Sequence, residues 1–240
     1  MTDNKLNTIL LIDTTTTACS VAMCHGKEII AERNFLEDKA QHASLIGVFG
    51  KEVLELSAQQ GYHPQAVALS AGPGSYTGLR IGTSFAKGIC FGYSIPLIPV
   101  STLELLAHEA IIHGDVPEGA WICPMIDARR MEVYTAIFDH KGNRITDDQP
   151  LIIDADIYAS ELQERNIVFV GNGSNKCSQV ITHRHAIFPQ RAYLPIASQM
   201  TELAHKAVKA EAYADVAYWE PHYLKEFVAV VGKNKVLGDL

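Results

Sequence analysis

Two aspartates stand at the ends of apolar runs, and both positions suit chemistry on a phosphate-bearing ligand. Asp13 ends one apolar run and precedes four threonines, Thr14–Thr17, whereas Asp127 ends a second run. A third apolar run ends in the turn Gly171–Ser174. Carboxylates can hold magnesium, while hydroxyl and backbone N–H groups can hold phosphate oxygens. Meeting in one cleft, these segments would form a nucleotide or anion site from Asp13, Thr14, Thr15, Asp127, Gly171 and Gly173.

The residue types at this site argue against turnover. Phosphoryl transfer uses glycine-rich loops, because they let backbone N–H groups approach the phosphates closely. Threonine fills all of 14–17, where glycine would help. We therefore expect neither active ATPase chemistry nor a resident cofactor, and any nucleotide binding would be vestigial or regulatory.

The histidines and cysteines do not form a recognisable metal or catalytic set. His108 and His113 are five residues apart, which places them on different sides of a predicted helix. His183 and His185 have no acid or third ligand near them in sequence. Five cysteines without a Cys-x-x-Cys pair are typical of reduced thiols. We expect no metal, no catalytic residue and a cytoplasmic location.

The stretch Gly72–Arg80 reads Gly-Pro-Gly-Ser-Tyr-Thr-Gly-Leu-Arg and joins an apolar strand to a helix. It is not a Walker loop, because Gly72 and Gly78 are six residues apart and Leu79 stands where lysine is required. It is not a dinucleotide fingerprint either. The pattern predicts a tight turn at a helix N-terminus, which either contacts an anion or serves only close packing.

The helix after this turn carries two rows of small residues. One row is Gly78, Gly82, Ala86 and Cys90, and the other is Ser84, Gly88 and Gly92. Glycine inside a helix costs up to about 1 kcal/mol relative to alanine, so these glycines need an offsetting gain. Close approach of the chain's own sheet supplies one gain, and a docked second protein supplies another. Both can hold at once.

Apolar periodicity predicts an α/β chain with two similar halves. In the first half we expect strands over 8–12, 19–23, 28–33, 66–70 and 95–100, and helices over 42–59, 79–93 and 102–112. After a linker over 113–119 we expect strands over 121–126, 133–138 and 166–170, and helices over 154–165 and 198–211. The last dozen residues carry no strong pattern.

Both halves open with a hairpin whose first strand ends in aspartate. This organisation resembles the duplicated ribonuclease-H-like fold of the sugar kinase, heat-shock chaperone and actin superfamily, in which the strand-end acids face each other across an interlobe cleft. We expect an N-terminal lobe over 1–112 that carries the partner-binding helices. We expect a smaller C-terminal lobe over 113–240, whose last helix and tail pack back on the first.

Charge and hydropathy exclude two classes of partner. The net charge of −7 gives no general attraction to nucleic acid, whose binding begins with neutralised phosphates. The longest uncharged run, 88–103, is interrupted by Pro96 and Pro99 and is too short to span a bilayer. The first residues show no signal-peptide pattern. We expect neither a membrane contact nor extensive direct contact with RNA.

Several motifs together resemble the TsaB family. They are Ile12-Asp13-Thr14, Ala18–Ala22, Gly72–Gly82, Pro99–Leu103, Ile126–Arg130 with Glu132-Val133-Tyr134, Val170–Gly173 and Pro221–Leu224. The match runs from about residue 8 to 225, and the glycine turn with its helix is its most specific part. The resemblance implies a bacterial subunit of the machinery that places threonylcarbamoyl on the adenosine beside the tRNA anticodon.

The resemblance also implies a pseudoenzyme, an inactive paralogue of the catalytic subunit TsaD. Thr102 and Leu106 occupy the places of TsaD's metal-binding His-x-x-x-His, and neither can ligate a metal. Family members pair with TsaD, or with a second copy of themselves, through the first two helices, and the ATPase TsaE joins the assembly. Contact with tRNA is then indirect. The implied interface consists of Ala43, Leu45, Ile46, Gly47, Phe49, Gly50, Gly78, Gly82, Phe85, Ala86 and Ile89.

Two alternatives stay open at this point. The chain could be an enzyme in its own right, either an ATPase or kinase of the same fold or a glycoprotease-like metallopeptidase. It could also be a homodimeric binding module with an unrelated client.

Overall fold

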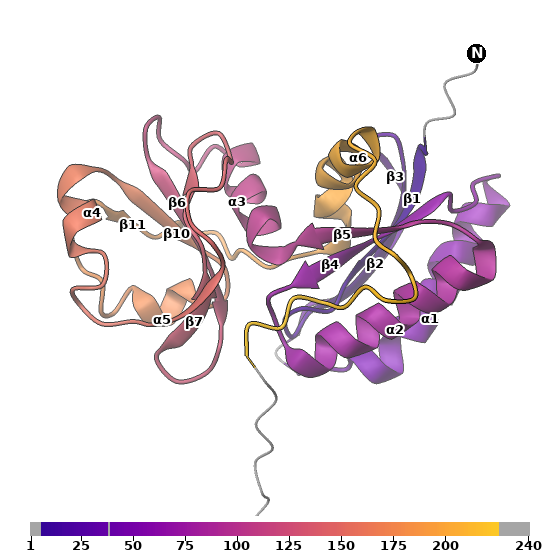
Figure 1. The fold of residues 1–240 in the computed structure, drawn as a ribbon, viewed down its shortest axis with the longest axis horizontal. Helices are drawn as coiled ribbons and strands as arrows, with labels where there is room; N and C mark the ends of the chain where they lie inside the picture. The colour runs from indigo at the N-terminus through magenta and orange to yellow at the C-terminus, as the bar shows by residue number, and fades with distance from the viewer. Residues whose placement is uncertain (1–5, 38, 226–240) are drawn as a thin grey trace, which may run out of the picture.

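The computed structural model describes residues 6–37 and 39–225. Two sheets lie side by side, each with helices on both faces, and they form two lobes (Figure 1). The two-lobed α/β architecture that the sequence predicted is therefore present. The predicted boundary between residues 112 and 113 stays a prediction, and the last dozen residues lie outside the described part of the chain.

The first lobe is built on a five-stranded sheet of order β3-β2-β1-β4-β5. Its strands are β1 (Thr8–Asp13), β2 (Cys19–His25), β3 (Glu28–Phe35), β4 (Ala66–Gly72) and β5 (Leu97–Ser101). β1 runs antiparallel to β2 and parallel to β4, with Ile12 paired to Leu69. Every residue of β1 is buried, as its continuous apolar run predicts for a central strand.

Two long helices cover one face of this sheet, α1 (His42–Gln59) and α2 (Tyr76–Tyr93) (Figure 1). α2 begins three residues earlier than predicted. The Ser75 hydroxyl caps it by accepting from the Gly78 N–H at 3.2 Å. The opposite face is covered by the short helix η1 (Ala197–Met200) and by α6 (Thr201–Lys209). Helix α3 (Thr102–Ile112) places Leu105 on that face, whereas Leu103, Leu106, Ala107, Ala110 and Ile111 pack in the core of the second lobe.

The second lobe has a sheet of order β11-β10-β6-β7-β9, with β8 also paired to β6. Its strands are β6 (Trp121–Asp127), β7 (Glu132–Thr135), β8 (Phe138–Asp139), β9 (Gln149–Ile152), β10 (Ile167–Val170) and β11 (Ala186–Ile187). Two short helices, α4 (Ala159–Glu164) and α5 (Ser174–Cys177), accompany it.

The structure corrects three predicted elements. The strand over 133–138 is two strands, because the chain leaves the sheet at Ala136–Ile137. The helix over 154–165 begins only at Ala159, since Asp154 forms a local turn with the Asp156 N–H at 3.0 Å instead of capping a helix. The helix over 198–211 is the η1 turn followed by α6, which ends at Lys209.

Candidate functional site

The first strand-end acid, Asp13, lies inside the first lobe. Its side chain has no solvent exposure, and it accepts hydrogen bonds from the Thr15 N–H at 3.1 Å and the Thr15 hydroxyl at 3.0 Å. Burial raises the pKa of the Asp13 carboxyl from 3.8 to about 6, because the charged form loses its hydration and the hydrogen bonds offset only part of that cost. This acid therefore has the environment of a core residue.

The glycine turn after β4 covers the threonine loop next to this acid. The Ser75 N–H donates to the Thr15 carbonyl at 2.7 Å, and the Thr14 hydroxyl donates to the Gly78 carbonyl at 2.8 Å. A Cβ on Gly74 would strike the Thr15 carbonyl oxygen, and a Cβ on Gly78 would strike that of Thr14. These two glycines serve the close packing of two loops, and the packed loops cover the buried acid.

The second strand-end acid, Asp127, is exposed but already paired. Its carboxylate accepts from the Arg129 N–H at 2.9 Å and forms an ion pair with the Lys176 ammonium. Lys176 also donates to the carbonyls of Arg130 and Glu132, each at 2.7 Å. Arg129 and Arg130 have φ of 68° and 52°, the left-handed region that side chains rarely adopt. The Lys176 ammonium thus pairs with the Asp127 carboxylate and holds the turn through Arg129 and Arg130 in its left-handed conformation.

The residues of the predicted nucleotide site fall into two separate groups, and nucleotide binding there stays a prediction. Asp13, Thr14 and Thr15 are buried, so they do not line an open cleft opposite Asp127. Gly171 and Gly173 do lie beside Asp127, since a Cβ on either would crowd the end of β6 at the Met125 carbonyl oxygen. The second half of the predicted site therefore forms within the second lobe, without the first half.

The inward row of small residues on α2 packs on the chain's own sheet. A Cβ on Gly82 would strike the Thr14 hydroxyl, and Ala86 is fully buried in the core between sheet and helices. On α1, a Cβ on Gly50 would strike the Phe85 ring, so this glycine lets the two helices approach each other. Internal packing therefore accounts for Gly50, Gly78, Gly82 and Ala86, and their contact with a partner stays a prediction.

The outward row of small residues has a different environment. A Cβ on Gly47, Gly88 or Gly92 would meet no atom of residues 6–37 or 39–225 within 4 Å. Nearby apolar side chains are also exposed, Val48 on α1 at 51% and Phe91 on α2 at 86%. The rest of the predicted interface divides as follows: Ala43 is exposed, Leu45, Phe49, Phe85 and Ile89 are half-buried, and Ile46 is buried.

A shallow groove separates the first turns of the two helices. It has a volume of about 330 Å³, and its lining includes Ala43 and Ser44 of α1 and Thr77 and Ile81 of α2. Together with the outward glycines, it leaves an apolar, indented surface on this side of the first lobe.

The described residues contain neither a cluster of metal-ligating side chains nor a helix suited to a bilayer. Among the residues that the structure describes, no three His, Cys, Asp or Glu side chains gather as metal ligands. In the same part of the chain, no helix has both the length and the apolar character needed to cross a bilayer.

Relatives of known family match almost the whole chain. The TsaB proteins of Haemophilus influenzae and Escherichia coli are both 30% identical over 92% of this chain, which covers 94% and 96% of those relatives. Both are tRNA threonylcarbamoyladenosine biosynthesis proteins. The chain belongs to the TsaB family. The TsaB protein of Bacillus subtilis is 29% identical over 91% of the chain.

A family model and two solved structures also match the chain. Residues 37–238 match the family model of TsaD, the tRNA N6-adenosine threonylcarbamoyltransferase. A Pseudomonas aeruginosa protein with similarity to the peptidase YeaZ superposes with a TM-score of 0.74 at 25% identity, covering 91% of this chain and all of the other. YeaZ from the same organism superposes with a TM-score of 0.72 at 24% identity over the same shares.

The sequence analysis of this TsaB-family chain missed Lys176, which forms an ion pair with the second strand-end acid, Asp127. Lys176 lies 49 residues after Asp127, on the short helix α5. It stands two residues after the turn Gly171–Ser174, which the sequence did single out. A basic residue just beyond that turn was the available signal, and it has meaning only once the turn is known to lie beside β6.

Proposed function

We propose that this chain is a non-catalytic scaffold and activator subunit in tRNA threonylcarbamoyladenosine synthesis. It binds TsaD through the outward faces of α1 and α2, and with TsaD it binds the ATPase TsaE. It contacts tRNA only through that complex. In isolation, the same faces pair two copies of the chain.

The observation that carries this proposal is the outward glycine row. Each glycine within a helix costs up to about 1 kcal/mol against alanine. Gly82 and Gly50 recover that cost through internal contacts, whereas Gly47, Gly88 and Gly92 have no such neighbour among the residues that the structure describes. A partner helix that approaches the backbone closely would supply the missing gain, and the exposed Phe91 would supply apolar area.

The acids support a non-catalytic role. Asp13 is buried beneath its own loops, and Asp127 is neutralised by Lys176. A stand-alone ATPase or kinase would need both acids to be accessible to a nucleotide and its metal ions. A glycoprotease-like peptidase would need a nucleophile or metal ligands in an open site. Neither rival gains support from the geometry.

The test substitutes arginine at two outward positions, Gly47→Arg and Gly88→Arg. Both side chains enter open space, so each variant should keep the wild-type melting temperature while losing co-elution with TsaD from the same organism in size-exclusion chromatography. Gln163→Arg, on the exposed side of α4, is the matched control and should co-elute normally.

Normal co-elution of both outward variants with TsaD would contradict the proposal that TsaD docks on the outward faces of α1 and α2. ATP hydrolysis or peptide cleavage by the purified chain would instead favour the enzyme interpretation. Loss of self-association in the variants, with no wild-type binding to TsaD, would favour a homodimer with another client.

A further inference from the structure

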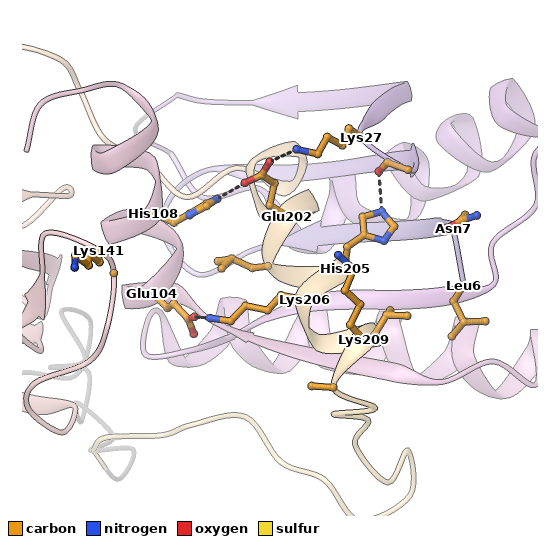
Figure 2. Close-up of a pocket in the computed structure, with 15 residues that line it drawn as sticks. Leu6, Asn7, Lys27, Glu104, His108, Lys141, Glu202, His205, Lys206 and Lys209 are labelled. Atoms are coloured by element: carbon orange, nitrogen blue, oxygen red, sulfur yellow. Dashed lines mark hydrogen bonds and ion pairs between the residues drawn. The ribbon is translucent and has the colours of Figure 1, made fainter. Parts of the chain in front are cut away.

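A large groove lies on the side of the first lobe opposite α1 and α2. Its volume is about 820 Å³, within the range of ligand sites. It is lined by five segments: the residues just before β1, the β2–β3 turn, helices α3 and α6, and the turn after β8 (Figure 2). Both lobes therefore contribute to one groove.

Internal contacts hold the groove walls in place. The His205 imidazole lies 2.7 Å from the Gly26 carbonyl oxygen, which joins α6 to the β2–β3 turn. On the other side, a Cβ on Gly142 would lie 3.3 Å from Ile111, so the turn after β8 packs against α3. The groove is preformed and needs no ordering of its walls before a ligand binds.

The charge of this groove is opposite to that of the whole chain. Four lysines but only two glutamates line it, in a protein whose net charge is −7. Glu202 pairs with Lys27 at 2.8 Å and lies 3.4 Å from the His108 ring. Glu104 lies 3.5 Å from Lys206. Both acids are thus engaged by groove cations.

Two of the four groove lysines form no ion pair with the groove's glutamates. Lys141 and Lys209 have no side-chain partner among residues 6–37 and 39–225. Lys141 belongs to the second lobe and Lys209 to α6 on the first, and both are exposed (Figure 2). A ligand with negative groups at two separated points could pair with both.

The rest of the lining identifies the class of ligand. Leu6, Leu203 and Val208 contribute apolar surface beside these lysines. Among the described residues, no phenylalanine, tyrosine, tryptophan or arginine lines the groove, and the rings of its two histidines, His108 and His205, lie against Glu202 and the Gly26 carbonyl. Single-stranded nucleic acid is held by stacking on aromatic rings and arginine, so the lining favours a ligand of apolar and acidic character over RNA.

We propose that this groove binds an acidic, amphipathic peptide segment of a partner protein. Its carboxylates pair with Lys141 and Lys209, and its apolar side chains cover Leu6, Leu203 and Val208. The site lies across the first sheet from α1 and α2, so it stays open while those helices are occupied. The chain then holds two polypeptides at once, and this second site does not depend on the first.

The probes are two labelled helical peptides that differ only in charge. One carries leucine on one face and glutamate on the other, and its counterpart carries lysine in place of glutamate. Fluorescence anisotropy should detect binding of the acidic peptide only. Binding to the double variant Lys141→Glu/Lys209→Glu should weaken about tenfold or more, since two attractive charge pairs become repulsive.

A matched variant controls for net charge. Lys51→Glu with Arg184→Glu makes the same charge change at exposed positions away from the groove and should bind the acidic peptide normally. The milder pair Lys141→Gln/Lys209→Gln, checked by melting temperature, should also weaken binding if reversal at the end of α6 harms folding.

Three results would overturn the proposal. The first is equal binding of both peptides, which would indicate nonspecific apolar contact. The second is undiminished binding of the acidic peptide to the groove variants. The third is lysine-dependent binding of an RNA hairpin without peptide binding, which would make the groove a nucleic-acid site.

Discussion

At the scale of single residues, two aspartates in equivalent positions have opposite environments. Both end the first strand of their lobe, yet Asp13 is fully buried and Asp127 has 44% of its side chain exposed. Burial raises the pKa of Asp13, whereas the Lys176 ammonium pairs with Asp127. Asp13 is thus excluded from solvent, whereas Asp127 stays exposed beside the ammonium of Lys176.

Asp13→Asn should reveal the cost of this buried charge. The folded-state pKa of about 6 lies above the ordinary value of 3.8, so the folded protein holds its proton more tightly than the unfolded chain. The resulting stability is fully present below pH 3.8 and is lost as pH rises through 6. Two pKa units correspond to about 3 kcal/mol.

Chemical denaturation across pH measures this effect. Asparagine keeps an acceptor for the Thr15 N–H but cannot ionise, so at neutral pH the variant should be more stable than wild type by up to about 3 kcal/mol. The two curves should converge in acid. A variant less stable than wild type at neutral pH would show that the charge of Asp13 is needed.

At the scale of elements, α2 carries two glycine rows with different functions. The inward row lets the helix approach the threonine loop and the sheet, as the contact of Gly78 with Thr14 demonstrates. The outward row makes no close contact within the described part of the chain, because Gly88 and Gly92 face open space there. Helix propensity is therefore reduced on the outward side without any internal gain.

A pair of alanine substitutions separates the two rows. Gly78→Ala forces a methyl group into the Thr14 carbonyl, and overpacking of this kind should lower the free energy of unfolding by about 1–3 kcal/mol. Gly88→Ala should raise it by up to about 1 kcal/mol, since only helix propensity changes. Urea unfolding measures both variants. Equal destabilisation by both would contradict the assignment of the two faces.

At the scale of the whole molecule, segments distant in sequence connect the lobes. Helix α3 packs on both sheets, and α6 returns to the first sheet after the chain has built the second. The segment that ends at residue 225 then contacts both lobes. The backbone N–H of His222 donates to the Ala71 carbonyl oxygen at 2.8 Å, and the His222 ring lies 3.4 Å from the Asp148 carboxylate. Lys225 pairs with Glu132 of β7.

This enclosure predicts that all five cysteines are unreactive in the folded protein. Each thiol is buried, and burial raises every thiol pKa, to about 12 for Cys19 and Cys123 and to about 11 for Cys24, Cys90 and Cys177. Thiolate is the reactive form, so a chromogenic disulfide reagent at about pH 8 should detect no thiol in native protein. It should detect five after denaturation. Rapid native labelling would disprove the tight packing.

The sequence by itself determined the α/β class, the order of elements in the first lobe and the TsaB family, but it missed the short elements β9, α5 and β11 of the second lobe. Strands such as β1 and helices such as α2 follow from local periodicity, and family motifs are local strings. Only the tertiary structure decided which glycine row faces inward, because both rows have the same spacing and differ only in what packs on them. It also decided that Asp13 is buried, that Lys176 reaches Asp127, and that five separate segments line the groove that contains Lys141 and Lys209. Burial and charge pairing depend on contacts between distant segments, which no local pattern contains.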